Sequence, residues 1–397
     1  MATAAAVTGV VATTPGSDVE LAALVVEGSS TNPTGEGIQD FYRGKFLQDD
    51  IVTVNFFTGP FGVYQALADN RGEDNVALSS GWGAANISLL LTYMDVVGSN
   101  DPALTDTLYV LDNNVARPNG GFGTRYPVFA VIGVNPIPTP TSPGAAVIDV
   151  GYEYDINGNT PAYVWNGVAM ANSLAAYLDR RLNQSEVDLP VDADGNLEGT
   201  AVDGRPLDAQ NCTNSNPCRV QTESGIARVE VVGETTYISY ESEDLPLTRP
   251  LRNLGEPGVR LANAIDPALR AVVDYGYPSN DPFADPGEYV PARVIPRPRE
   301  TVKFVNDFTD GVREGLSTLD DDSTNESTTA VNRRARSEVR DSLNFTPRAS
   351  SERTTSAGSA RPIADAVKLG LDRLRNSVTG GEDGDDDSSP GGDAGGD

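Results

Sequence analysis

The sequence predicts an α/β protein: a mainly parallel sheet of the α/β-hydrolase type with helices on both faces, followed by a disordered C-terminal tail. Short apolar runs alternate with amphipathic segments as far as residue 319, the pattern of a covered parallel sheet. One strand leads through a turn of small residues directly into a helix, in NVALSSGWGAANISLLLTYM (75–94). From residue 320 onward large apolar side chains are scarce, so that segment cannot form a core.

Composition limits the function classes. The 397 residues carry a net charge of −28, from 29 basic and 57 acidic residues. This charge repels nucleic acid and argues against an anionic membrane surface as partner. The chain contains no histidine, and therefore lacks the usual general base and the commonest metal ligand. We expect no metal and no cofactor.

The N-terminal segment, residues 1–20, is expected to be a leader. Its apolar run ends at Val10-Val11-Ala12, which fits the later part of a secretory signal peptide although the basic start is missing. A disordered Ala/Thr-rich leader is the alternative. No run approaches the roughly 20 apolar residues of a membrane span, so we do not expect an integral membrane protein.

Strands and helices are predicted in alternation. The predicted strands are 21–26, 51–57, 76–78, 108–111, 145–154 and a hairpin of 227–232 with 235–240, and the predicted helices are 63–69, 87–94, 168–182, 261–273 and 301–319. A loop of small residues follows the first strand, and the N–H groups of Gly28, Ser29 and Ser30 in it are candidates for binding an oxyanion. Many ordinary loops have the same composition.

A polar, Gly/Asp-rich segment, residues 189–220, is predicted to be an insertion loop or lid. It contains Cys212 and Cys218 in a polar turn, where we predict a disulfide that would stabilise the fold by roughly 2 kcal/mol. Two unpaired thiols are the alternative. Further on, Glu241, Glu243 and Asp244 form an acidic cluster. Paired carboxylates can cleave glycosides or bind calcium, but a solvated face is the preferred interpretation in so acidic a chain.

The turn after strand 76–78 carries the main functional signal. A strand, a sharp turn and a helix hold the nucleophilic serine in α/β-hydrolases, yet here Trp82 is predicted at the tip. Trp82 either fills the space of a substrate carbonyl or, exposed to a cavity, stacks on a sugar or lines a lipid groove. Moving the register would place Ser79 at the tip, but a base to activate it would still be lacking.

Five blocks occur in an order that resembles a known family. They are NVALSSGWGAANISLL, RPNGGFGTRYP, VGYEYDINGNTPAY, TTYISYESEDLPLTRPLRNLGEP and IDPALRAVVDYGY. Together they resemble the PE-PPE C-terminal domain, an exported, cutinase-like serine-hydrolase family of mycobacteria and related actinobacteria, over residues 21–278. The resemblance implies an α/β-hydrolase domain at 21–319 and a place in the cell envelope or outside the cell.

The resemblance also implies a Ser–Asp–His triad that cleaves or transfers acyl esters, often of envelope lipids. Carried over by position, Ser80 stands at the first glycine of the family's elbow, Trp82 at the nucleophile and Ala84 at the following small residue. Asp155 matches the first Asp of the family's Y-D-G segment, and Asn159 stands where the second Asp would be. The histidine has no counterpart, so we expect a degenerate member with no intact catalytic set.

The expected function is therefore non-catalytic, with a binding or structural role at the envelope. Its expected partners are an envelope lipid, a glycolipid or another envelope protein. One alternative is an active esterase or acyltransferase with an unorthodox base. Another is an interaction protein that works through its tail, residues 320–397, which include a candidate amphipathic helix at 363–375.

Overall fold

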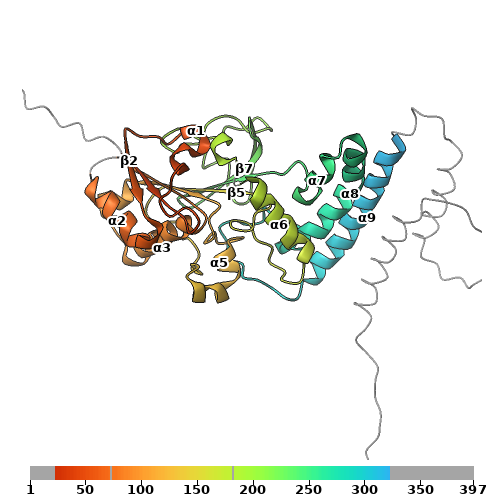
Figure 1. Cartoon of the computed structure of the whole chain (residues 1–397), viewed down its shortest axis with the longest axis horizontal. Coiled ribbons are helices and arrows are strands. Elements are labelled where there is room, and N and C mark those ends of the chain that lie inside the picture. Colours follow the sequence, from red (N-terminus) through yellow and green to blue (C-terminus); the bar gives the residue numbers. More distant parts are fainter. Residues whose placement is uncertain (1–22, 72–73, 181–182, 322–397) are drawn as a thin grey trace, which may run out of the picture. The chain divides into compact units, whose positions relative to one another are not determined.

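Eight strands form one sheet in the order β2-β1-β3-β4-β5-β8-β7-β6, shown in a computed structural model that describes residues 23–71, 74–180 and 183–321 (Figure 1). The strands are β1 (Ala23–Glu27), β2 (Asp50–Val54), β3 (Val76–Ser80), β4 (Leu108–Asp112), β5 (Val147–Tyr152), β6 (Cys218–Thr222), β7 (Gly225–Val232) and β8 (Thr235–Tyr240). The pairs from β2 to β8 are parallel, whereas β7 pairs antiparallel with β8 and β6. The predicted α/β class with a mainly parallel sheet is confirmed. The predicted leader and residues 322–397 of the predicted C-terminal tail lie outside the described residues, whereas residues 320 and 321 belong to the helix α9 (Pro298–Asp321).

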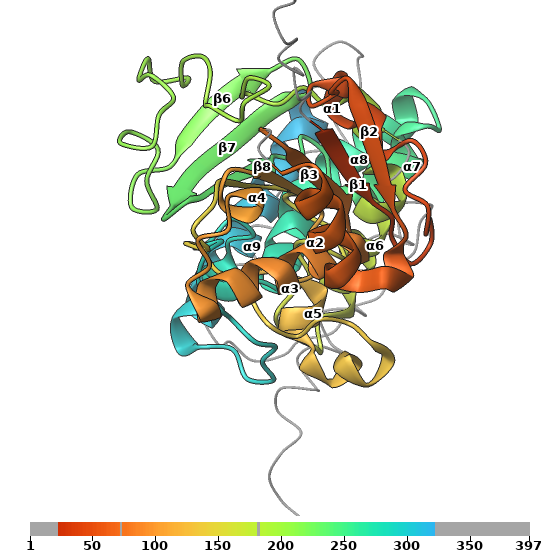
Figure 2. The same ribbon diagram turned by 90° about the vertical axis from the view of Figure 1, so that its left-hand side faces the viewer.

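Two long helices cover one face of the sheet. α2 (Gly59–Asp69) and α3 (Trp82–Val97) pack against each other beside the strands (Figure 2). Their apolar side chains join those of β1, β3 and β4 in one buried cluster. The strands are apolar on both sides, and β1 is buried along its whole length, as expected for a central parallel strand.

The other face is covered mainly by irregular chain. The short elements η1 (Ile38–Asp40), α1 (Phe41–Gly44) and η4 (Gln184–Glu186) lie there with the segment predicted to be a lid. Val191 and Leu207 of that segment are buried against the sheet. Lys45 donates to the carbonyl oxygens of Leu189 and Val191 at 2.8 and 2.5 Å, and Cys212 and Cys218 are joined in a disulfide. The segment therefore forms part of the core cover.

A helical layer follows in the second half of the chain. It consists of α6 (Gly167–Arg180), α7 (Arg249–Arg252), α8 (Glu256–Asp274) and α9 (Pro298–Asp321), with α8 and α9 packed along each other (Figure 1). The remaining short helices are η2 (Phe56–Thr58), α4 (Pro102–Thr105), α5 (Phe122–Arg125), η3 (Pro127–Ile132), η5 (Pro246–Thr248) and η6 (Pro278–Asn280). A buried cluster around Tyr154, Val273 and Tyr277 joins this layer to the end of β5.

Two of the differences from the predicted strands have local reasons. β2 ends at Val54 because the side chain of Asn55 accepts a hydrogen bond from the Phe57 N–H and starts η2, a typical cap. β6 was not predicted, since its polar sequence CRVQT is exposed on one side at the sheet edge.

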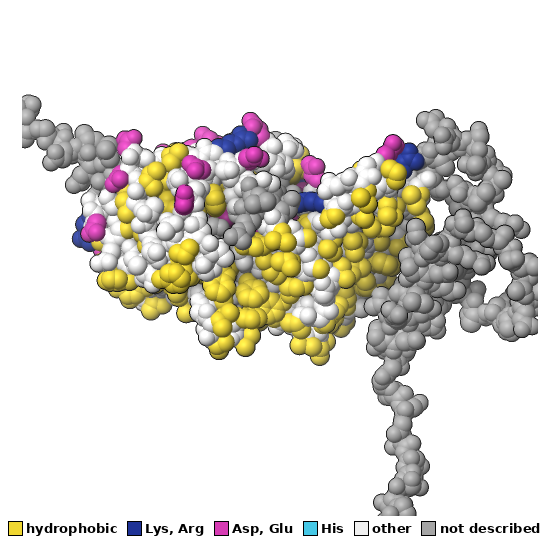
Figure 3. All heavy atoms as spheres, in the orientation of Figure 1, with side chains coloured by type: hydrophobic (Ala, Val, Ile, Leu, Met, Phe, Trp, Pro, Cys, Tyr) yellow, Lys and Arg dark blue, Asp and Glu magenta, His cyan; other side chains and the backbone are white. Residues whose placement is uncertain are grey.

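The molecular surface is uneven in polarity. On the face drawn in Figure 3, the Asp, Glu, Lys and Arg side chains lie along the upper edge and the left end, and hydrophobic side chains gather along the lower edge.

Candidate functional site

The turn between β3 and α3 has its tip at Gly81. This residue has φ 59° and ψ −114°, and Trp82 is the first residue of α3. The structure thus differs from the expectation that Trp82 forms the tip. A turn this sharp requires a strained backbone conformation at its tip. This conformation costs more free energy for any residue other than glycine. In a nucleophile elbow the strained residue is the one that carries the attacking hydroxyl.

The geometry therefore shifts the elbow register by one residue. Ser79 takes the first position of the motif, Gly81 the tip and Gly83 the last position. A Cβ on Gly83 would lie 2.1 Å from the Gly28 carbonyl oxygen and 2.2 Å from Ser79 Oγ, so this glycine is required by close packing. Ala84 is buried in α3. The elbow has kept its shape, and its tip carries no side chain.

A cavity of about 440 Å³ opens directly at this tip. It lies at the carboxyl edge of β1 and β3, where ligands bind in open α/β sheets. Its walls combine hydroxyl, amide and aromatic side chains with one carboxylate, that of Glu36; the lining residues are Ser29, Ser30, Thr31, Asn32, Glu36, Gly37, Ile38, Phe41, Ser80, Gly81, Trp82, Asn157, Tyr177 and Gln184. No lysine or arginine is among them.

Trp82 lies between this cavity and the core. It is half-buried and packs against Ala85, Val115 and Val134, while another part of the side chain lines the cavity. A cavity therefore remains beside the indole, and Trp82 does not fill the site completely.

Asp112 organises the polar wall of the cavity. It is the last residue of β4, paired in register with Ser80, and its side chain is fully buried. Ser80 Oγ donates to Asp112 Oδ2 at 2.7 Å, Tyr42 Oη donates to Oδ1 at 2.7 Å, and Gln184 Nε2 donates to Oδ2 at 3.2 Å. Asp112 was not among the site residues predicted from the sequence. The sequence carries a signal for Asp112, because this residue directly follows the predicted strand 108–111, the next predicted strand after the elbow strand 76–78.

Ser79 is the less suitable of the two elbow serines. It is fully buried, and its Oγ donates to the Glu27 carbonyl oxygen at 3.0 Å. The Glu27 carboxyl group is buried as well, which raises its pKa well above the usual range, although a hydrogen bond from Asn86 acts in the opposite direction. Ser79 therefore fixes the packing of β1 against β3, and only Ser80 faces the cavity.

The predicted oxyanion loop borders the cavity, but two of its three backbone N–H groups already donate to carbonyl oxygens of the chain. The Gly28 N–H donates to Val54 O at 3.0 Å, and the Ser29 N–H donates to Asn32 O at 2.8 Å. An oxyanion hole needs N–H groups directed at the reacting oxygen. Of the three residues, Ser30 alone has a backbone N–H without an acceptor in the described part of the chain.

The side chains at the two positions matched to catalytic acids stabilise the conformation of a loop. Asp155 Oδ1 accepts from the N–H groups of Asn157 and Gly158 at 2.6 and 2.9 Å. Asn159 Nδ2 donates to the carbonyl oxygens of Glu153 and Pro282 at 2.7 and 2.8 Å. This loop carries Asn157 to the cavity, where its Nδ2 would lie 3.3 Å from a Cβ added at Gly81.

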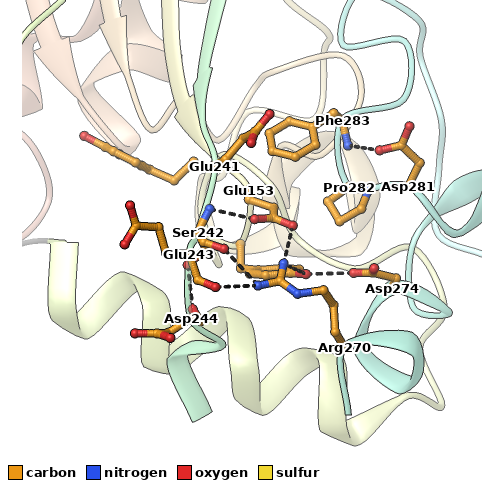
Figure 4. Close-up of polar contacts among 12 residues, drawn as sticks. Glu153, Glu241, Ser242, Glu243, Asp244, Arg270, Asp274, Asp281, Pro282 and Phe283 are labelled. Atoms are coloured by element: carbon orange, nitrogen blue, oxygen red, sulfur yellow. Dashed lines mark hydrogen bonds and ion pairs between the residues drawn. The ribbon is translucent and has the colours of Figure 1, made fainter. Parts of the chain in front are cut away.

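The acidic cluster after β8 does not converge on a common site. Figure 4 shows Glu241, Glu243 and Asp244 pointing in different directions. Glu241 pairs with Arg219 at 2.5 Å, and Asp244 pairs with Arg252 at 2.8 Å. The arrangement offers neither a catalytic carboxylate pair nor a cation site. Throughout the described residues no group of His, Cys, Asp and Glu could hold a metal ion.

The polar network beside this cluster is centred on Arg270 (Figure 4). Its Nη1 lies 2.8 Å from Glu153 Oε1, and its Nη2 donates to the Ser242 carbonyl oxygen at 2.8 Å. Tyr154 Oη donates to Asp274 Oδ1 at 2.8 Å. Burial raises the pKa of Asp274 to about 7, opposed by the Tyr154 hydrogen bond.

The segment that builds this network also identifies the chain's relatives. Residues 213–278 match the model of the PE-PPE domain. The resemblance inferred from the sequence blocks is thereby confirmed. These residues include β6, β7, β8 and α8, that is, the antiparallel edge of the sheet and the helix that carries Arg270.

Three proteins of Mycobacterium tuberculosis are similar to the chain. The uncharacterized PPE family protein PPE42 (strain CDC 1551 / Oshkosh) is 29% identical over 182 residues, 44% of this chain and 26% of the relative. The uncharacterized PPE family protein PPE28 (strain ATCC 25618 / H37Rv) is 27% identical over 209 residues, 51% of this chain and 27% of the relative. The PE family protein PE3 of the latter strain is 27% identical over 173 residues, 43% of this chain and 31% of the relative.

The matched region thus spans less than a third of each of these relatives. No solved structure matches the chain. Within the described residues, none of the helices has both the length and the apolar character needed to cross a bilayer.

Proposed function

We propose that this chain is a non-catalytic, envelope-associated protein of the PE-PPE type that binds a neutral, polyhydroxylated ligand in the cavity at Gly81. The observation that carries the proposal is the tip of the elbow: a glycine occupies the strained position, and a cavity of about 440 Å³ opens directly above it. The site has kept the room for a ligand and lacks the hydroxyl that would attack it.

The lining favours a neutral ligand with many hydroxyl groups. Serine, threonine and asparagine side chains supply donors and acceptors, and Trp82, Phe41 and Tyr177 supply flat apolar faces. Sugars need both, because their C–H faces stack on aromatic rings while their hydroxyl groups form hydrogen bonds. An anionic ligand would find one carboxylate and no cation in the lining, an unfavourable environment. The headgroup of a neutral glycolipid meets these requirements.

A second candidate function rests on Ser80. Its Oγ lies 2.7 Å from Asp112 Oδ2, within proton-transfer distance, and this is the unorthodox base that an active esterase or acyltransferase would need. Against it, the Asp112 carboxylate also accepts from Tyr42 and Gln184, so Ser80 is one member of a fixed network. Ser80 also precedes the tip of the turn.

Two measurements test the catalytic part of the proposal. The full chain should neither be labelled by a fluorophosphonate probe nor hydrolyse p-nitrophenyl butyrate above the rate of its Ser80→Ala variant. Labelling of Ser80, together with turnover that disappears in Ser80→Ala and persists in Ser79→Ala, would establish the esterase instead.

Ligand binding is tested through the indole in the cavity wall. The chain has two tryptophans, so Trp165→Phe leaves Trp82 as the only reporter. We expect n-octyl glucoside below its micellar concentration to change Trp82 fluorescence saturably, and n-octyl phosphate to have no such effect. Calorimetry on Trp82→Ala should show binding about tenfold weaker or more. Equal responses to both amphiphiles would contradict the neutral-headgroup assignment.

An interaction role of the C-terminal tail is the remaining alternative. Apart from residues 320 and 321, the tail lies outside the described residues, so the proposal for the cavity is independent of it.

A further inference from the structure

A run of exposed apolar residues forms a turn on the lower edge of the described chain. We call residues 127–133 (PVFAVIG) the apolar tip; they comprise η3 and the glycine that ends it. All seven are exposed and none is charged, and Val128, Val131 and Ile132 have exposed fractions of 68%, 86% and 62%. Figure 1 places this turn below α5, and Figure 3 shows hydrophobic side chains gathered at the same edge. An exposed apolar run this long marks a functional contact.

The apolar tip is a firmly built structure. Phe129 N–H donates to the Tyr126 carbonyl oxygen, Gly133 N–H to that of Ala130, and Val134 N–H to that of Phe129, at 3.0 to 3.3 Å. The Phe129 ring lies 4.9 Å from that of Phe122, which packs on the same cluster as Trp82. A turn that satisfies its own backbone hydrogen bonds can enter a hydrocarbon layer without leaving polar groups unpaired.

A second exposed apolar segment lies beside α5. The Ala292 N–H donates to the Arg125 carbonyl oxygen at 3.0 Å, which holds residues 292–295 next to the helix that leads into the apolar tip. Val294 and Ile295 then protrude, with exposed fractions of 69% and 82%. The apolar surface is thus formed by segments about 160 residues apart in sequence.

The charge beside this surface is opposite to that of the whole chain. Arg297 and Arg299 are exposed and follow directly after Ile295. From residue 290 to 303 the chain carries four basic residues and one acidic residue, Glu300, which is buried. Lys303 is paired with Asp307 at 2.6 Å, so Arg297 and Arg299 are the exposed positive charges of this stretch. Charges act over a Debye length of about 8 Å at physiological ionic strength. A partner at this surface therefore interacts with Arg297 and Arg299 more strongly than with distant acidic residues, although the net charge of the chain is −28.

We propose that the apolar tip and Val294–Ile295 insert into the surface of an anionic lipid layer, with Arg297 and Arg299 on its headgroups. Apolar side chains that enter the acyl boundary beside arginines that contact headgroups are the features of proteins that bind at lipid interfaces. This inference is independent of the ligand proposed for the cavity. The net charge of the chain argued against an anionic membrane surface as partner. The proposal differs from that expectation because two exposed arginines lie at the proposed contact.

The test is sedimentation of the full chain with phosphatidylcholine vesicles, with and without phosphatidylglycerol. We expect the wild type to bind the mixed vesicles. The variant Val131→Asp/Ile132→Asp should bind them at least about tenfold more weakly, because a carboxylate resists entry into the lipid layer. The matched control Val96→Asp/Val97→Asp alters two exposed valines on α3 and should bind like the wild type. Unchanged thermal unfolding of both variants shows that the fold is retained.

The arginines are tested separately. Arg297→Gln/Arg299→Gln should remove the preference for phosphatidylglycerol and weaken binding to mixed vesicles about fivefold or more. The control Arg71→Gln/Arg313→Gln removes the same charge from exposed sites and should retain the preference. The proposal is overturned if the wild type binds neither vesicle or if the tip variant binds as well as the wild type. It is also overturned if the wild type ignores vesicles and the tip variant converts a dimer to a monomer, because the occupant is then a second copy.

Discussion

Gly81 decides what the cavity can do chemically. The backbone at this residue has the strained geometry of an elbow, but its hydrogen side chain supplies no hydroxyl group at the tip. Ser79 and Ser80, at the first and second positions of the motif, donate to the Glu27 carbonyl oxygen of β1 and to Asp112, respectively. In a nucleophile elbow the attacking hydroxyl lies at the tip and beside a base, whereas the two serine hydroxyl groups here belong to residues that precede the tip.

Buried carboxyl groups are the other residues with unusual chemistry. Burial raises the pKa of Asp149 to about 6, although Arg117 and a hydrogen bond from Asn114 lower it, and burial raises the pKa of Asp274 to about 7. A carboxyl group whose pKa is higher in the folded state holds its proton there to a higher pH. The free energy of unfolding must then fall as the pH rises from about 4 to about 7.

Asp274→Asn should remove part of this pH dependence. The amide oxygen can still accept the Tyr154 hydrogen bond, while no charge is buried above pH 7. We expect the variant to be more stable than the wild type at pH 8, on the order of 1 kcal/mol or more, and similar to it at pH 5. Urea unfolding at both pH values measures this. The exposed control Asp194→Asn should leave the profile unchanged; a larger stability gain at pH 5 than at pH 8 would contradict the burial argument.

At the scale of elements, the crossing of α8 and α9 depends on two glycines. A Cβ on Gly315 would lie 1.9 Å from the Ala264 carbonyl oxygen, and one on Gly311 would lie 2.6 Å from the Pro267 backbone. The helices approach each other backbone to backbone at these points. The sequence predicted a helix at 301–319, but it gave no indication of how closely the partner helix lies.

Gly315→Ala should separate the two helices. The added methyl group has no room, and overpacking of this kind costs about 1–3 kcal/mol even though alanine favours the helix. Thermal unfolding measures the loss. Gly167→Ala in α6 is the matched control, because a Cβ there meets nothing within 4 Å, and it should be neutral or slightly stabilising. Equal effects of the two substitutions would show that the close approach does not limit α9.

At the scale of the whole described chain, one buried network ties the helical layer to the sheet. Arg270 of α8 contacts Glu153, just after β5, and the carbonyl oxygen of Ser242, just after β8 (Figure 4). The Ser242 N–H in turn donates to Glu153 Oε2 at 2.7 Å. The Glu153 side chain is 8% exposed, so its charge depends on Arg270.

Arg270→Met should therefore weaken the whole fold. Removing one partner leaves the Glu153 carboxylate buried without its counter-ion, at a cost of about 3–5 kcal/mol. Urea denaturation should show a lower midpoint, with partial recovery in Arg270→Met/Glu153→Gln. Arg260→Met on the same helix breaks an exposed pair with Glu256 and should have a much smaller effect. Similar losses for Arg270 and Arg260 would refute the structural role of the network.

The sequence by itself determined the class of fold and the family resemblance. The apolar pattern of each segment predicts whether it forms a strand or a helix, because each element must bury its own apolar face. This pattern is a local property of the sequence. That the chain contains no histidine is likewise known from the sequence alone. The spacing of Cys212 and Cys218 sufficed for the disulfide prediction because both residues lie in one short turn.

The tertiary structure alone decided where the site's groups lie. The tip moved from Trp82 to Gly81 because the backbone torsion, rather than the motif register, selects the strained residue. Asp112 meets Ser80 through the pairing of β3 with β4, and the lower apolar surface combines the apolar tip with Val294–Ile295. These contacts join residues far apart in the chain, and no local pattern encodes which distant partner will share an edge or a surface.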